Sequence, residues 1–89
     1  MTIYVDELQT YGKRQWCHMA TDGRLFGDLS ELHAMATKIG LKNSWFQDHP
    51  RVPHYDLVAS KRRLAVSYGA VEITAKELFE KCKRKDVEK

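Results

Sequence analysis

The start of a predicted helix carries residue types that bind anions. Ser60, Lys61 and Arg62 fall in its first turns, where backbone N–H groups lack partners within the helix and the helix dipole is positive. A hydroxyl donor and two cations at such an end favour a phosphate or a carboxylate. The alternative is structural, because a lysine such as Lys61 often packs its methylenes on the core and keeps its ammonium in water.

Residues 44–56 add aromatic and polar side chains without any amphipathic period. Trp45 and Tyr55 can stack on a base or another planar ring, whereas Gln47 and Asp56 can match its donors and acceptors. Loops of this composition often carry function, although Trp45 can equally fill the edge of the core. Together with the anion site, the segment predicts a pocket for a phosphate-bearing or nucleotide-like small molecule. The predicted ligand-binding residues are His18, Trp45, Gln47, His54, Tyr55, Asp56, Ser60, Lys61 and Arg62.

Two histidines are candidates for acid–base catalysis. His18 and His54 carry imidazoles whose ordinary pKa lies near neutrality, which suits hydrolysis or phosphoryl transfer. Cys17 does not form a dyad with its neighbour His18, because successive residues of a strand point to opposite faces. A small hydrolase or phosphoryl-transfer enzyme is therefore an alternative function, and the sequence leaves turnover undecided. His33 and His49 are predicted to lie at the surface.

A metal site is a weaker interpretation of the same histidines. His49, His54 and Asp56 follow a His-x4-His-x-Asp spacing, which matches no zinc signature and is interrupted by both prolines of the chain. We therefore expect no metal, and the sequence identifies no cofactor. Strand ends could add further ligands from Asp6, Glu7 or His18.

The elements that must position these residues alternate between strands and helices. Apolar residues at helical spacing predict a helix from Asp28 or Ser30 through Lys38, and Gly40 suits the position just past its end. β-branched and aromatic runs predict strands over residues 2–5, 16–21 and 70–74, with a loop over 12–15.

A second helix is predicted over residues 57–68, with Asp56 as its candidate N-cap. Its apolar stripe is expected to face the core, and helical spacing places Lys61 on the same stripe, so that this cation leans inward. The apolar members of the stripe are Leu57, Leu64 and Tyr68.

The Thr74-Ala75-Lys76-Glu77 segment has the form of a capping box and predicts a last helix through about Lys83. This order of elements predicts an α/β fold, a compact single domain with a small mixed or partly parallel sheet and about three helices. Residues 1–75 form the α/β domain in this interpretation, and residues 76–89 form a C-terminal helix and a basic tail.

Composition narrows the classes of function. A chain of 89 residues that is 43% hydrophobic and 30% charged is expected to fold as one small domain. Residues 76–89 hold six Lys or Arg against four acids, so +2 of the net charge of +3 lies there. An excess confined to the tail is a weak electrostatic footprint, and we do not expect binding to nucleic acid.

The location is predicted to be the cytoplasm. No apolar run reaches the ~18–20 residues of a membrane span, and the short acidic start does not resemble a signal peptide. Cys17 and Cys82 lie far apart in the sequence and are predicted to be reduced thiols, so neither a disulfide framework nor a CxxC metal motif is available.

Ordered motifs that include the candidate residues run along the chain, and with them the chain resembles the family catalogued as domain of unknown function 4031. The resemblance covers roughly residues 1–75 and implies a small stand-alone protein of bacteria or their phages, with a shared polar pocket but no assigned reaction. It marks His33 as well, and it leaves the tail beyond Glu77 outside the motifs. The motifs are Tyr4-Val5-Asp6, His18, Glu31-Leu32-His33-Ala34, Ser44-Trp45-Phe46-Gln47, Pro53-His54-Tyr55-Asp56, Ser60-Lys61-Arg62 and Gly69-Ala70-Val71.

The leading hypothesis is therefore a cytoplasmic module that binds a small-molecule anion or nucleotide. A third hypothesis is a phage or bacterial interaction protein that inhibits a host protein through an exposed Trp45-Phe46 patch. A protein partner and a homo-oligomer both stay open.

Overall fold

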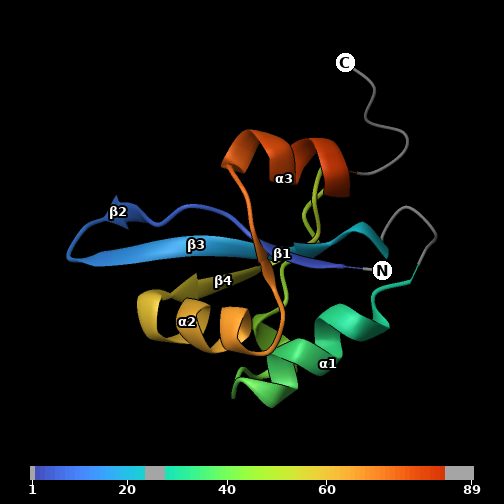
Figure 1. The fold of residues 1–89 in the computed structure, drawn as a ribbon, viewed down its shortest axis with the longest axis horizontal. Helices are drawn as coiled ribbons and strands as arrows, with labels where there is room; N and C mark the ends of the chain where they lie inside the picture. The colour runs from blue at the N-terminus through green and yellow to red at the C-terminus, as the bar shows by residue number, and fades with distance from the viewer. Residues whose placement is uncertain (1, 24–27, 84–89) are drawn as a thin grey trace.

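The computed structural model describes residues 2–23 and 28–83 of the chain. Within them, a five-stranded sheet of parallel and antiparallel strands packs with three α-helices (Figure 1). The predicted α/β class, with a small mixed sheet and about three helices, is confirmed. The elements are β1 (Ile3–Val5), β2 (Gln9–Tyr11), β3 (Arg14–Thr21), α1 (Ser30–Lys38), the 3₁₀ turn η2 (Asn43–Trp45), β4 (Tyr55–Val58), α2 (Ala59–Ser67), β5 (Val71–Glu72) and α3 (Ala75–Cys82).

The long strand β3 is the centre of the sheet. Met19 pairs with both Val5 of β1 and Tyr55 of β4, so β1 and β4 lie on opposite edges of β3. Trp16 pairs in the same way with β2 and β4, which places β2 on the same edge as β1. These pairs are antiparallel, whereas β5 adds to β1 as a parallel strand.

The register changes by one residue between β1 and β2. Val5 pairs with Met19, and Gln9 pairs with Trp16. Three residues therefore lie between the two pairs on the first segment and only two on β3. Asp6 lies opposite His18, and the next two residues of the chain share one partner on β3. A bulge of this kind bends the strand and re-aims the side chains beside it. Asp6 lies directly at this irregularity, and its backbone N–H donates to the carbonyl of His18 at 3.2 Å.

The helices cover the two faces of the sheet unequally. Figure 1 shows α1 and α2 against one face and α3 against the other. The first face carries the main core, in which side chains of the strands such as Met19 and Leu57 pack with Leu32 and Ala36 of α1. On the second face, Leu78 and Cys82 of α3 are buried with residues at one end of β3. No described helix covers the remainder of that second face, which we call the open face, and the histidines of the candidate site lie there.

The start of the second helix differs from the sequence prediction. Leu57 and Val58 belong to β4 and pair with Cys17 and Trp16 of β3, so α2 begins at Ala59 and ends at Ser67. Asp56 lies within the strand and caps no helix, because the N-cap position is Val58. A short apolar run fits either a strand or a helix, and here the pairing with β3 determines the outcome.

The predicted apolar stripe of this helix is also wrong in part. Leu64 and Tyr68 are exposed, whereas Ala65 is fully buried against the main core. Leu57 lies in β4 and therefore does not mark the buried side of the helix. The side of α2 that faces the sheet is the one that carries Ala65, with Lys61 and Arg62 one turn before it. The predicted inward position of Lys61 is confirmed by its bond to a backbone carbonyl of the α1 C-terminus.

Local signals were more reliable at the other helices. Helix α1 spans the predicted range, and Gly40 follows it with a positive φ of 89°. The capping box of Thr74 and Glu77 is present at the start of α3, which ends at Cys82. The sequence prediction missed the hairpin of β2 and β3. Strand β3 begins at Arg14, within the predicted loop, and pairs with the unpredicted β2 through a turn at Gly12. Of the predicted basic tail, residues 84–89 lie outside the described residues.

A matched pair of substitutions tests the corrected boundary. Leu57→Ala is expected to lower the free energy of unfolding by about 2–5 kcal/mol, because it empties a fully buried position of β4. Leu64→Ala is expected to change it by less than about 0.5 kcal/mol, since that side chain is 40% exposed. Urea unfolding of both variants measures the difference, and a larger effect at Leu64 would restore the longer helix.

Candidate functional site

The open face of the sheet brings together polar residues from three segments. His18 of β3 lies directly opposite Asp56 of β4, and the two side chains therefore share a face. Gln47 and His54 form an isolated antiparallel bridge, with N–O distances of 2.9 and 3.0 Å, which closes the intervening loop over residues 48–53. The Gln47 amide also donates to the carboxylate of Asp56. The loop is thus held against β4 at the point where the histidines gather.

The buried carboxylate of Asp6 fixes the orientation of His18. It accepts the backbone N–H of His18 at 2.6 Å and the Nδ1 of its ring at 2.7 Å. The hydrogen bond to Asp6 raises the pKa of His18, and partial burial acts in the opposite direction. Because Nδ1 is used in this bond, Nε2 is the nitrogen of His18 that is left for a ligand.

His54 is held differently and titrates in the other direction. Its Nδ1 lies 2.8 Å from the carbonyl oxygen of Val52, and its ring meets that of His18 edge-on with centroids 4.9 Å apart. Burial lowers the pKa of His54, so the neutral imidazole is favoured. The Nε2 of His54 lies 3.5 Å from an oxygen of Asp56. Ligand atoms of His18, His54 and Asp56 all lie within 4.8 Å of one another, a grouping that could hold a metal ion.

Arg62 supports this arrangement from the opposite side of the sheet. Its Nε donates to the backbone carbonyl of Asp6 at 2.8 Å, and its Nη1 lies 2.9 Å from the carboxylate of Glu72 on β5. With 17% of its side chain exposed, Arg62 joins α2 to the ends of β1 and β5. It was predicted to hold an anion, and in the structure its guanidinium has these partners within the protein.

The predicted cluster of Ser60, Lys61 and Arg62 does not converge. The Nζ of Lys61 donates to the carbonyl of Ile39 at 2.8 Å, at the C-terminal end of α1, whereas Arg62 extends toward Asp6. Ser60 is exposed. The cations at the start of α2 therefore mainly bind backbone carbonyls of neighbouring elements.

Two adjoining surface cavities, each of about 470 Å³, contain most of the other predicted site residues. They share Trp16, Gln47 and Asp56 and therefore adjoin at β4, an edge strand of the sheet, where they form one depression. One extends toward the histidines and is lined by Tyr11, Trp16, Cys17, His18, Gln47, His49, His54 and Asp56. The other extends toward η2 and is lined by Arg14, Trp16, Leu41, Trp45, Gln47, Asp56, Val58 and Lys61.

Tyr55 lies on the other side of β4 and is fully buried. Its hydroxyl is 2.7 Å from Nδ1 of His33, and Phe46 packs against both rings. The ring of Tyr55 therefore has no exposed face on which a ligand could stack. His33, predicted at the surface, is half-buried and belongs to this aromatic cluster.

The sequence prediction missed three residues at the site. Asp6 had been considered only as an extra metal ligand, and Arg14 and Trp16 had not been singled out. Trp16 could have been predicted from the sequence. It lies two residues before His18 in the same strand, and residues i and i+2 of a strand share a face. The role of Asp6 depends on the bulge, for which the sequence gives no local sign.

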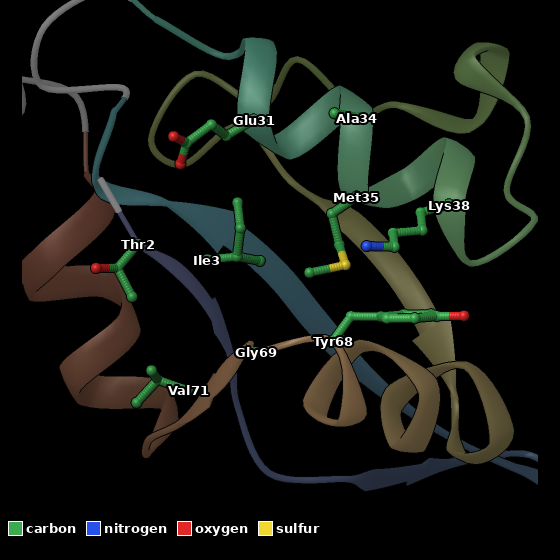
Figure 2. Close-up of a pocket in the computed structure, with 9 residues that line it drawn as sticks. All are labelled: Thr2, Ile3, Glu31, Ala34, Met35, Lys38, Tyr68, Gly69 and Val71. Carbon is green, nitrogen blue, oxygen red and sulfur yellow. The ribbon is translucent and has the colours of Figure 1, made fainter.

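A further cavity of about 540 Å³ lies between α1 and the β5 edge of the sheet (Figure 2). Its two charged residues are Glu31 and Lys38, and the ammonium of Lys38 lies 4.4 Å from the ring centroid of Tyr68. Figure 2 shows these two side chains with the hydroxyl-bearing Thr2 and Tyr68 and with apolar residues such as Ile3 and Met35. A site is marked by convergent polar groups more than by size, and the open sheet face has them while this groove does not.

Fold and site together define a small α/β domain with a depression lined by histidines and tryptophans. The chain belongs to the family described as Protein of unknown function (DUF4031), which matches residues 3–85. The match continues past residue 75, where the recognised motifs end, and includes α3. No curated protein and no solved structure matches the chain. None of the helices in the described part of the chain is long and apolar enough to cross a membrane.

Replacing Asp6 tests the histidine arrangement. In Asp6→Asn the pKa of His18 is expected to fall toward the ordinary value of about 6.5, because the charged acceptor is lost. Titration of the imidazole NMR signals measures both histidines, and His54 serves as the internal control that stays below that value. A His18 that titrates identically in both proteins would contradict the assigned role of Asp6.

The same shifts set opposite pH dependences of stability. A raised pKa means that the contribution of His18 is fully present below its ordinary pKa and is lost as pH rises through the folded-state value. The lowered pKa of His54 has the reverse sign, since its contribution is present above the ordinary pKa and is lost as pH falls through the folded-state value. Asp6→Asn should therefore remove stability mainly on the acidic side.

Proposed function

We propose that this protein binds a phosphate-bearing, nucleotide-like small molecule in the depression beside η2. The observation that carries the proposal is that two tryptophans and two cations line one cavity. Trp16 and Trp45 lie there with Arg14 and Lys61, over an apolar surface. A volume of about 470 Å³ falls within the range of small-molecule sites.

The aromatic and amide groups supply the part of the site that suits a planar ring. Trp45 is 52% exposed, so its indole is accessible for stacking. Gln47 and Asp56 lie at the junction of the two cavities, where the amide already donates to the carboxylate. That bond orients both groups and leaves further acceptor and donor capacity on each for the edge of a base.

The cations supply the part that suits a phosphate. Lys61 donates one N–H to the carbonyl of Ile39, and an ammonium has three. Arg14 is exposed at the start of β3 and offers the planar, bidentate geometry that phosphate oxygens favour. The proposal thus keeps Lys61 from the predicted anion site and replaces Ser60 and Arg62 with Arg14.

The histidine-lined cavity extends this depression, and His18 and His54 would contact the more distant part of a bound molecule. Tyr55 has no direct role in the proposal because it is buried. A cytoplasmic location remains part of the proposal, and it is consistent with Cys17 and Cys82 being buried free thiols.

Intrinsic fluorescence tests the proposal directly, because both tryptophans of the chain line the cavity. Titration with adenosine and guanosine mono-, di- and triphosphates, ribose 5-phosphate and inorganic phosphate should give a saturable change with at least one nucleotide. Arg14→Gln is expected to weaken that binding by about 10- to 100-fold, since a charge-assisted bond contributes about 1.5–3 kcal/mol.

The matched control is Arg63→Gln, which removes an exposed arginine of α2 outside the two cavities. It should bind as the unaltered protein does. Absence of any response in the panel, or equal losses in the two arginine variants, would contradict the proposal. Chromatography of the bound nucleotide after incubation shows whether it is also converted, which would favour the hydrolase or phosphoryl-transfer alternative.

A further inference from the structure

We infer that His18, His54 and Asp56 form a binding site for a divalent transition-metal ion. These side chains come from β3, from the residue just before β4, and from β4 itself. Their ligand atoms lie within 4.8 Å of one another. Two imidazoles and one carboxylate are the donor set of many zinc and non-haem iron sites with an open coordination position.

The hydrogen bonds of the two histidines leave the same nitrogen of each ring for the metal. A backbone carbonyl only accepts, so the Nδ1 of His54 must carry the proton in its bond to Val52. The carboxylate of Asp6 likewise accepts from Nδ1 of His18. In each neutral ring the lone pair is therefore on Nε2. Metal-binding histidines in proteins almost always have such a second partner, either a carboxylate or a carbonyl.

The distance between His54 and Asp56 suits two ligands of one metal ion. The Nε2 of His54 lies 3.5 Å from an oxygen of Asp56. This separation is longer than the 2.7–3.2 Å of an N–H···O hydrogen bond. It is close to the ~3.3 Å between two ligands of a tetrahedral zinc ion with bonds of about 2.0–2.1 Å. A metal ion between the two atoms could take both of them as ligands.

The surrounding structure holds the carboxylate in place. Gln47 donates to one oxygen of Asp56, and the other oxygen is the one that faces His54. The pairing of His18 with Asp56 across β3 and β4 fixes the third ligand relative to the other two. The cluster is therefore supported by strand pairing and hydrogen bonds, and its members do not depend on a flexible surface loop alone.

The cluster favours nitrogen and oxygen coordination without sulfur. Cys17 is next to His18 in sequence, but its side chain is buried in the main core on the helix-covered face. Because successive residues of a strand point to opposite faces, the thiol points away from the side of the sheet that carries the imidazole of His18. The site therefore differs from Cys-containing zinc sites, and its open side faces the cavity of about 470 Å³. A water or a ligand oxygen could complete the coordination there.

Zn²⁺ and Co²⁺ are the probes, with the full chain and without any nucleotide, so that the result is independent of the proposed nucleotide site. Calorimetry with Zn²⁺ should show saturable binding of one ion per chain. Co²⁺ should give visible d–d absorption without the near-ultraviolet thiolate band that a cysteine ligand produces. His54→Gln and Asp56→Asn should each weaken Zn²⁺ binding at least tenfold, and Asp6→Asn by about 10- to 100-fold.

His33→Gln is the matched control, because His33 lies on the helix-covered side and glutamine can still bond the Tyr55 hydroxyl. It should leave Zn²⁺ binding unchanged. NMR of the unaltered protein provides a measurement that does not depend on variant folding, since Zn²⁺ should shift Nε2 of both His18 and His54 and leave their Nδ1 protons in place. The inference is overturned by undiminished binding in His54→Gln and Asp56→Asn, by a thiolate band, by unshifted Nε2 signals, or by no saturable binding of Zn²⁺.

Discussion

The buried carboxylate of Asp6 is the group on which the rest of the site depends. A carboxylate whose side chain is 2% exposed is stable in the folded protein only when hydrogen bonds replace water. Here the backbone and the ring of His18 both supply such bonds. They tie the end of β1 to the middle of β3 at the register change and orient the imidazole. Because Arg62 binds the carbonyl of Asp6 from the other side, one residue couples α2 to the open face.

The open face exists because the helices cover the sheet unequally. Helices α1 and α2 bury one face, whereas the eight residues of α3 reach only one end of the other. Along β3 the two faces alternate, so that Cys17 and Met19 enter the core while Trp16 and His18 line the depression. A single strand thus contributes both to stability and to the candidate site. The polar residues lie where none of the described helices covers the sheet.

The cations of α2 show how a segment suited to ligands can be used within the fold. Lys61 and Arg62 are neighbours, but consecutive helical residues project about 100° apart and therefore contact different elements. Lys61 binds a carbonyl at the C-terminal end of α1, where the helix dipole favours a cation, and Arg62 binds Asp6. The cations that line the depression beside η2 are thus Lys61, which already binds a carbonyl, and Arg14, which lies far away in the sequence.

Short-range signals in the sequence determined the α/β class, helix α1 and the capping box of α3, because helical spacing and capping act within a few residues. The sequence also identified His18, His54 and Asp56 by residue type. Which of them lie together was decided by the pairing of β3 with β4, and the contribution of Asp6 by the bulge after β1. Both depend on hydrogen bonds between distant segments and on burial of the intervening residues such as Leu57. The same long-range pairing made a strand of a run that could locally have begun a helix.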